Sequence, residues 1–323
     1  MRTIPHIKIA QLPTPVEILP RLTTVLGGPK ILVKRDDLTG LAFGGNKTRK
    51  LEYLLAEAQA HGARTIITAG AVQSNHCRQT AAACARLNFK CILVLSGDKP
   101  ATATGNLLLD RLFNAEIIWT SYEEGDQLLQ QTFQKAWEEG KRPYLIPYGG
   151  SNTTGATAYV YAMQELLSQK YKPDWIVFAS SSGGTQAGLA AGARIFGFGG
   201  NILGISVDEP EAKLKDRVAS LATATADALG ENATFQPEDI LVNDNYLGAG
   251  YGMMGAPEIE AIRLFAHQEG LLLDPVYTGR AAAGLIDLIR HGYFKPEETV
   301  LFWHTGGTPA IFSEKYAHLV DPD

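Results

Sequence analysis

The sequence predicts an α/β protein with parallel-rich sheets that helices cover on both faces. Short apolar segments alternate with longer segments of helical periodicity along the whole chain. The apolar segments do not alternate with polar residues, which is typical of strands buried on both faces of a parallel sheet. No internal repeat or low-complexity stretch interrupts this order. At 323 residues, the length suits two lobes with a sizeable core.

Short apolar runs bounded by turn residues predict the strands. In chain order they span residues 31–37, 65–69, 91–95, 115–119, 144–147, 175–179, 202–207 and 300–304. Leucines and alanines at helical spacing predict a helix after residue 50, and further helices are predicted over 77–87 and 106–113. The segment 248–257 is rich in glycine and lacks periodicity, so a loop is predicted there.

Composition excludes several classes of partner. Hydrophobic residues make up 45% and charged residues 20%, as in ordinary soluble globular proteins. The net charge of −5 gives no indication of a nucleic-acid or anionic-membrane partner. No apolar run is long enough to span a bilayer, and the first residues lack the apolar stretch of a signal peptide. The three cysteines form no C-x-x-C pair, so neither a disulfide framework nor a metal site is expected. A cytoplasmic location is expected instead.

The most informative segment is GGNKTRK, from Gly44 to Lys50. Its paired glycines place Lys47 where a strand gives way to a helix. A lysine held there by the backbone can face a cleft, lose its hydration and become nucleophilic, as Schiff-base chemistry requires. A solvated lysine at a helix start is the ordinary alternative. The turns further along the chain favour the catalytic interpretation.

Residues 40–48 also come close to the phosphate-binding loop G-x-x-x-x-G-K-[ST]. Asn46 adds one residue between the last glycine and the lysine, and this would displace the lysine from the phosphates. The pattern therefore does not favour a nucleotide triphosphatase.

A second turn, SSSGGT from Ser180 to Thr185, follows the predicted strand 175–179 and opens a helix. Its N–H groups would converge on an anion at the positive end of the helix dipole. A phosphate site is expected here, with a serine-capped tight turn as the alternative. Asp208 lies at a spacing that would suit a ribose contact. However, Thr185 occupies the position of the second glycine of a G-x-G-x-x-G run, so a dehydrogenase is not favoured.

A third turn, GAVQSNH from Gly70 to His76, also follows a strand and begins a helix. Ser74 and Asn75 near the helix start could hold a small carboxylate through hydroxyl and N–H groups. A plain helix cap would explain one of these polar residues but not the set. His76 by itself carries little weight, because a histidine near a cap is more often a hydrogen-bonded structural residue than an acid or base.

Together these turns resemble the fold-type II family of pyridoxal-phosphate enzymes, the tryptophan synthase β-like group. Within it, the chain is most similar to the branch of D-cysteine desulfhydrases and 1-aminocyclopropane-1-carboxylate (ACC) deaminases. The resemblance runs almost from end to end, through residues 14–15, 34–37, 44–52, 73–76, 274–277 and 304–307. It implies a two-domain enzyme and a homodimer. Residues 1–49 and 160–323 would form the large cofactor-binding domain, and residues 50–159 a small domain inserted in it.

The resemblance also implies roles for individual residues. Lys47 would carry pyridoxal 5′-phosphate (PLP) as a Schiff base, and the residues expected to act on the substrate are Lys47, Ser74 and Tyr277. The expected cofactor contacts are Lys47, Lys50, Asn75, Ser182, Gly183, Gly184, Thr185, Thr278 and Thr305. The expected contacts to a small amino-acid substrate are Gln73, Ser74, Asn75, His76 and Tyr277.

Two threonines separate the branches of the family. ACC deaminases characteristically have a glutamate after the motif tyrosine and a leucine after the late histidine, whereas this chain has Thr278 and Thr305. The threonines match the pattern of D-cysteine desulfhydrases. A neutral hydroxyl leaves the pyridine nitrogen of PLP less basic than a carboxylate would. Because thiolate is a good leaving group, its expulsion needs less carbanion stabilisation than the opening of a cyclopropane, so the threonines favour β-elimination.

We therefore expect PLP-dependent α,β-elimination on D-cysteine, which yields pyruvate, hydrogen sulfide and ammonia, with Lys47 or Tyr277 as the base. ACC deaminase and L-cysteate sulfo-lyase activities are the alternatives. A protein that only carries PLP is the non-enzymatic alternative. Such a carrier would need Lys47 and the phosphate turn but neither Tyr277 nor the cluster at 73–76.

Overall fold

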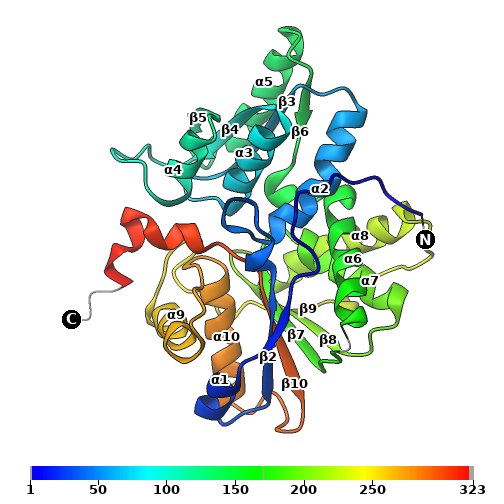
Figure 1. The fold of residues 1–323 in the computed structure, drawn as a ribbon, viewed down its shortest axis with the longest axis vertical. Helices are drawn as coiled ribbons and strands as arrows, with labels where there is room; N and C mark the ends of the chain where they lie inside the picture. The colour runs from blue at the N-terminus through cyan, green and yellow to red at the C-terminus, as the bar shows by residue number, and fades with distance from the viewer. Residues whose placement is uncertain (1, 170, 320–323) are drawn as a thin grey trace.

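Two sheets organise the molecule, in a computed structural model that describes residues 2–169 and 171–319. In spatial order, the larger sheet contains β1 (Val16–Ile18), β2 (Lys30–Arg35), β10 (Thr299–His304), β7 (Trp175–Ser180), β8 (Asn201–Ser206) and β9 (Leu241–Asn243). The smaller sheet contains β5 (Glu116–Thr120), β4 (Lys90–Ser96), β3 (Thr65–Ala71) and β6 (Pro143–Leu145). All neighbouring strands are parallel except β1 and β2. Figure 1 shows the smaller sheet in the upper lobe and the larger one in the lower lobe.

Helices pack on both faces of each sheet. In the described part of the chain they are α1 (Pro20–Leu26), α2 (Asn46–Ala60), α3 (Asn75–Leu87), α4 (Gly105–Leu112), α5 (Gly125–Glu138), α6 (Thr153–Ser168), α7 (Gly184–Phe196), α8 (Glu211–Ala228), α9 (Ala256–Glu269) and α10 (Thr278–Arg290). Helices α1, α9 and α10 cover one face of the larger sheet, and α6, α7 and α8 lie on the other side (Figure 1). Helices α2, α3 and α4 cover one face of the smaller sheet, and α5 covers the other.

Consecutive residues of a strand point their side chains to opposite faces of the sheet, and helices bury both faces. On β2, Ile31 and Val33 belong to the core under α9 and α10, whereas Leu32 belongs to the core under α6. All three side chains are almost fully buried. A strand buried on both sides is apolar at every position, which is why the predicted strands show no alternation.

The predicted fold class is confirmed, and each predicted strand forms with its ends shifted by a few residues. The first strand ends at Arg35, because residues 36–38 turn into a short 3₁₀ helix. Two short edge strands, β1 and β9, were not predicted. Each has only three residues, too few to show a periodicity of its own.

Helices α2 and α6 pack against each other between the two sheets. All strands of the smaller sheet fall within residues 50–159, the segment expected to form the inserted domain. The expected boundaries at 49/50 and 159/160 fall inside α2 and α6, and they stay a prediction. In the described part of the chain, no helix has both the length and the apolar character needed to cross a membrane.

Candidate active site

A cavity of about 660 Å³ is lined by residues of both lobes. The carboxyl ends of β3, β4 and β7 and the turns that follow β3, β6, β7 and β8 contribute to its wall. Open parallel sheets place ligands at this end of their strands. Of the residues predicted for the site, those that line the cavity are Lys47, Ser74, Asn75, His76, Ser182, Gly183, Thr185, Tyr277 and Thr305.

Lys47 lies in the first turn of α2, and the two glycines before it fix its position. Gly44 has a left-handed backbone, and a Cβ there would lie 2.1 Å from the carbonyl oxygen of Asp37, so only glycine fits. The Lys47 ammonium donates to the Asn46 side chain at 3.0 Å. Loss of hydration and the nearby Arg78 charge lower the pKa of Lys47 to about 8, against the opposing effect of Asp274. An amine with such a pKa is partly neutral, and therefore nucleophilic, near neutral pH.

The turn after β7 is a candidate anion cradle at the start of α7. No side chain caps this helix, and the Gly184 N–H points to the Ser151 hydroxyl at 3.2 Å. Ser151 in turn lies 2.7 Å from the Ser182 hydroxyl. The Lys50 ammonium donates to the Gly149 carbonyl at 3.0 Å and to Ser151 at 3.2 Å. Burial, with the Lys47 charge beside it, holds the pKa of Lys50 well below its usual value, so an anion brought here would stabilise its charged form.

The opposite wall of the cavity is the turn before α3. Ser74 caps this helix, its hydroxyl accepting from the Cys77 N–H at 3.2 Å. The Asn75 side-chain oxygen accepts from the Asn106 amide at 2.9 Å. His76 pairs through Nε2 with the Thr68 hydroxyl at 2.9 Å. Burial and the charges of two lysines hold the pKa of His76 well below its usual value, so the imidazole is neutral at neutral pH.

Tyr277 meets a second tyrosine that the sequence did not single out. The hydroxyls of Tyr251 and Tyr277 lie 2.7 Å apart, and both side chains line the cavity. The Asp274 carboxylate accepts from the N–H groups of Tyr277 and Thr278 and so fixes the chain at the start of α10. Burial raises the pKa of both tyrosines, which keeps them as protonated phenols at neutral pH.

Comparison with known proteins agrees with the presence of a candidate Schiff-base lysine beside a candidate phosphate turn. A sequence model described as "Pyridoxal-phosphate dependent enzyme" matches residues 7–306. The chain belongs to this family.

Curated relatives and solved structures narrow the position within the family. The chain is 44% identical to a protein named D-cysteine desulfhydrase from Salmonella choleraesuis (strain SC-B67), over 96% of both chains. It is 43% identical to a protein of the same name from Salmonella typhi, again over 96% of both. A solved structure titled an ACC deaminase homologue is 37% identical, with a TM-score of 0.90 over 98% of this chain and 97% of that one. These findings confirm the family resemblance.

The cysteine synthase structure from Entamoeba histolytica shares the fold at 16% identity, with a TM-score of 0.66 over 96% of this chain and 88% of that one. The expected fold type is confirmed by these neighbours.

The cradle at α7 fits the phosphate of the family's cofactor. A Cβ on Gly184 would lie 2.6 Å from the Ser151 hydroxyl and 2.9 Å from the Lys50 ammonium. A Cβ on Gly149 would lie 2.5 Å from the Ser182 hydroxyl and 3.5 Å from Cε of Lys47. The absence of these two side chains leaves hydroxyls, an ammonium and helix N–H groups around one space, next to the candidate Schiff-base lysine. Such a donor set suits a phosphate dianion.

Four predicted site residues lie outside the lining of the cavity. They are Lys50, Gln73, Gly184 and Thr278. Lys50 and Gly184 belong to the cradle just described. The Gln73 side chain accepts from the Asn106 N–H at 2.8 Å and donates to the Thr104 carbonyl at 3.0 Å, so it joins two helix starts. The Thr278 hydroxyl is fully buried and donates to Asp274 at 2.7 Å.

Sequence reasoning missed several residues of this site. Tyr251 stands in the glycine-rich segment that was predicted only as a loop. Ser151 follows a strand in the run GGSN, the same type of turn as those that were recognised, and could have been found by that signal. Asn46 was seen only as an insertion in a phosphate loop. Its side-chain amide in fact donates to Thr185 at 3.1 Å and joins the starts of α2 and α7.

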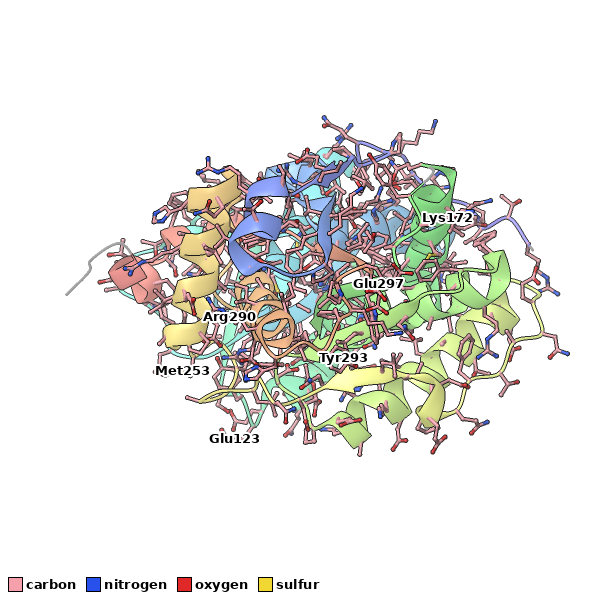
Figure 2. The ribbon with its side chains drawn as sticks, turned by 90° about the horizontal axis from the view of Figure 1, so that it is seen from below. Glu123, Lys172, Met253, Arg290, Tyr293 and Glu297 are labelled. Carbon is pink, nitrogen blue, oxygen red and sulfur yellow. The ribbon has the colours of Figure 1, made fainter. Side chains whose placement is uncertain are left out.

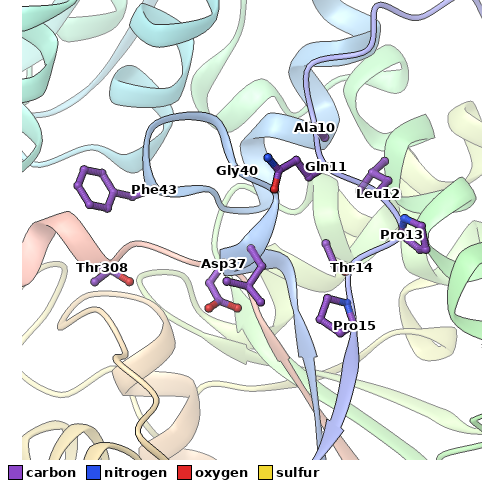
Figure 3. Close-up of a pocket in the computed structure, with 11 residues that line it drawn as sticks. Ala10, Gln11, Leu12, Pro13, Thr14, Pro15, Asp37, Gly40, Phe43 and Thr308 are labelled. Carbon is purple, nitrogen blue, oxygen red and sulfur yellow. The ribbon is translucent and has the colours of Figure 1, made fainter.

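A second hollow of about 870 Å³ lies between the N-terminal segment and the loop after β2 (Figure 3). It is lined by residues 10–15, Asp37, Leu38, Gly40, Phe43 and Thr308. Its acidic group, Asp37, is paired with Arg35 at 2.7 Å. We place the candidate active site in the smaller cavity, which contains the perturbed lysine and the tyrosine pair.

Proposed function

We propose that this chain is a PLP-dependent lyase that converts D-cysteine and water to pyruvate, hydrogen sulfide and ammonia. The observation that carries the proposal is the cavity that Lys47 shares with the Tyr251–Tyr277 pair, which brings a nucleophilic amine and two protonated phenols to one space. Curated relatives named D-cysteine desulfhydrase, 44% identical over nearly the full length, support the choice of substrate.

Different residues would bind different parts of PLP. Lys47 would hold PLP covalently, and the Lys50 cradle with the start of α7 would hold its phosphate. Bound there, PLP supplies an electron sink for the α-carbon of the amino acid. The start of α3 at Ser74 and Asn75 would bind the substrate carboxylate through N–H and hydroxyl groups.

The pKa shifts indicate which residue removes a proton and which residues donate one. The lowered pKa of Lys47, about 8, allows its amine to take the α-proton near neutral pH. The raised pKa of Tyr277 keeps that phenol protonated, so it is suited to donate a proton and not to remove one. We therefore assign the α-proton to Lys47 and the proton that reaches the departing sulfur to the Tyr251–Tyr277 pair.

The charges of the cavity favour a thiol over a sulfonate. Acidic side chains in its lining are Asp126, Asp208 and Glu209. Arg217 also lines it, but this guanidinium donates to Glu209 at 2.5 Å and to the Ser181 carbonyl at 3.1 Å. Apart from Lys47, which would hold the cofactor, Arg217 is the cation in this lining, and its donors already have acceptors, so we do not favour L-cysteate as the substrate.

ACC deamination is the second candidate, supported by the 37% identical structure titled an ACC deaminase homologue. The deciding experiment supplies holoenzyme with D-cysteine, L-cysteine, L-cysteate, β-chloro-D-alanine and ACC, and assays the keto acid and the released group. We expect sulfide and pyruvate from D-cysteine with the highest kcat/KM for a thiol substrate. Preferred formation of 2-oxobutyrate from ACC, or of sulfite from L-cysteate, would replace the proposal.

Two further observations complete the test. A PLP carrier would show no turnover and no change of its visible spectrum on addition of D-cysteine. A homodimer and a cytoplasmic location remain parts of the proposal, and light scattering of the holoenzyme would decide the first.

A further inference from the structure

The Arg280 guanidinium lies buried at the start of α10, with 1% of the residue exposed. Its nitrogens donate to a carboxylate and to backbone carbonyls of distant segments. Nε donates to Glu258 at 2.9 Å, Nη1 to the carbonyls of Val207 at 2.8 Å and Gly250 at 3.1 Å, and Nη2 to the Met253 carbonyl at 2.6 Å. The side chain thus joins α10 to the end of β8 and to the loop before α9.

That loop, residues 247–255, is called the tyrosine loop below. Its internal backbone hydrogen bonds are long, from Gly250 N–H to Leu247 and from Met253 N–H to Gly250, both at 3.2 Å. Contacts from outside hold it more closely. Besides Arg280, the Tyr316 hydroxyl donates to the Gly252 carbonyl at 2.8 Å. In Figure 2, Met253 lies at the edge of the molecule, so solvent reaches the outer side of the loop.

Glu258 completes the arrangement. One oxygen of this carboxylate accepts from Arg280, and the other accepts from the Gly255 N–H at 2.9 Å. Arg280 and Glu258 therefore hold three backbone groups of the tyrosine loop, at Gly250, Met253 and Gly255. Both side chains are nearly inaccessible to solvent, so their interaction is little screened.

The two carbonyls that Arg280 holds in the loop flank Tyr251. This tyrosine reaches into the cavity, where its hydroxyl lies 2.7 Å from that of Tyr277 and the two rings meet edge to face at 6.0 Å. Tyr277 stands one turn before Arg280 at the start of α10. A single side chain therefore connects the backbone on both sides of Tyr251 to the helix start that carries its partner.

We propose that Arg280 is a positioning residue that keeps the hydroxyl of Tyr251 on that of Tyr277 in the cavity. The catalytic consequence rests on the function proposed above, whereas the hold on the tyrosine loop does not. Arginine suits this task because its planar fork of N–H donors reaches several acceptors at once, whereas a lysine ammonium on a flexible stem cannot span the same carbonyls.

A double-mutant cycle tests whether Arg280 acts through Tyr251. In the holoenzyme, Arg280→Lys keeps the charge but loses the fork, and we expect kcat for D-cysteine to fall by roughly 10-fold while KM changes less. In a Tyr251→Phe background, the same change should lower kcat by no more than about 2-fold, because the hydroxyl to be positioned is already gone. Equal effects in the two backgrounds would overturn the proposal.

Phe265→Leu serves as the matched control for loss of stability. Phe265 is fully buried on α9, and its ring centroid lies 5.3 Å from that of Phe302 on β10. The change loosens the same helix that carries Glu258 but leaves the hydrogen bonds of Arg280 and Glu258 to the loop in place. We expect its effect on kcat to be the same with and without the Tyr251 hydroxyl.

Hydrogen exchange gives a readout that does not depend on turnover. Peptides covering the tyrosine loop should exchange faster in Arg280→Lys than in the wild type or in Phe265→Leu, at equal temperature. Unchanged exchange in Arg280→Lys would overturn the hold on the loop. If the wild type releases no sulfide from D-cysteine, the proposed function fails, and the exchange measurement still decides whether Arg280 holds the loop.

Discussion

The chemistry at Lys47 depends on the charges and the lost hydration around one amine. The amine is held at the cavity wall by a backbone that only glycine can follow, and its pKa falls to about 8. Arg78 contributes to this shift from a fully buried position on α3, where it also donates to the Gly44 carbonyl at 2.9 Å. Asp274 acts in the opposite direction. The reactivity of the lysine is thus set by residues far from it in the sequence.

Lys47→Ala should abolish covalent retention of PLP and leave the fold intact, because the side chain lies at a cavity wall and not in a core. Turnover of D-cysteine should fall by about 10²- to 10⁴-fold or more, the range expected for loss of a proton-transferring group. Visible absorbance after dialysis measures retention, and far-UV circular dichroism checks the fold. Turnover at the wild-type rate would show that Lys47 is not the Schiff-base lysine.

The pKa of Lys47 also predicts the pH dependence of apoenzyme stability. The folded state releases this proton near pH 8, whereas the unfolded chain keeps it to about pH 10.5. Between these values the unfolded state binds more protons, so the free energy of unfolding should rise with pH. Urea denaturation of the apoenzyme at several pH values, in wild type and in Lys47→Met, measures this rise. A slope between pH 8 and 10.5 that Lys47→Met leaves unchanged would contradict the assignment.

At the scale of elements, the site is assembled from the starts of helices. Helices α2, α3, α7 and α10 all begin at the cavity, each directly after a turn at the carboxyl end of a sheet or beside it. The N–H groups and dipoles at the starts of α3 and α7 would provide positive potential for the carboxylate and the phosphate of the proposed function. The polar side chains of these two turns would then fix where each anion binds.

Gly184→Val should weaken PLP binding by roughly 10-fold, equivalent to about 1.4 kcal/mol. A Cβ at this position would come within 2.9 Å of the Lys50 ammonium, and the branched side chain would occupy the space of the phosphate. Gly199→Val is the control, because a Cβ there meets nothing within 4 Å. Titration of the apoenzymes with PLP compares the two. Equal affinity in Gly184→Val and the control would place the phosphate elsewhere.

Asp274→Ala should destabilise the protein by about 1–3 kcal/mol, because it leaves buried N–H groups without an acceptor. The lost acceptor serves Val276, Tyr277 and Thr278, so Tyr277 should also lose its fixed position and kcat should fall. Denaturant unfolding and steady-state kinetics measure the two effects. A variant with wild-type kcat would show that this cap does not position Tyr277.

At the scale of the whole molecule, a buried charge network joins the 3₁₀ helix after β2 to α2, α6 and β10. The Asp36 carboxylate accepts from the Arg49 guanidinium at 2.8 Å, from the Tyr159 hydroxyl at 2.6 Å and from the Trp303 indole at 2.8 Å. Glu165 pairs with the same arginine from α6 at 2.8 Å. These contacts fix α2, and with it Lys47, against the larger sheet.

Arg49→Met should destabilise the protein by about 3–5 kcal/mol, since it leaves the buried Asp36 carboxylate without its ion-pair partner. Adding Asp36→Asn should recover part of this loss by removing that charge. Urea unfolding of the single and double variants measures both effects. The two residues would not be coupled if their effects on the free energy of unfolding were additive. In that case Asp36→Asn would destabilise the Arg49→Met variant as much as it destabilises the wild type.

Acid should also weaken this network. The Arg49 charge, against the effect of burial, holds the pKa of Asp36 below its usual range. The resulting stabilisation is present above the unfolded pKa of an aspartate and is lost as the pH falls through the folded value. In Arg49→Met, the midpoint of acid unfolding should therefore move to a higher pH than in the wild type.

The sequence by itself determined the strands other than β1 and β9 and the turns that carry the candidate site, and it singled out one candidate lysine. Fully buried strands are apolar at every position, and glycine pairs and serine clusters mark turns, so both are local properties that the residue order records. The candidate lysine at Lys47, the cradle at Ser182–Thr185 and the wall at Ser74–His76 follow from such local patterns. The order of the turns along the chain sufficed to identify the family.

Only the tertiary structure decided which distant groups meet. Tyr251 comes to Tyr277, and Arg280 to the carbonyls beside Tyr251. These contacts join segments whose separate sequences carry no mark of one another. The physical reason is that a hydrogen bond depends on distance and direction, and the packing of helices on two sheets sets both.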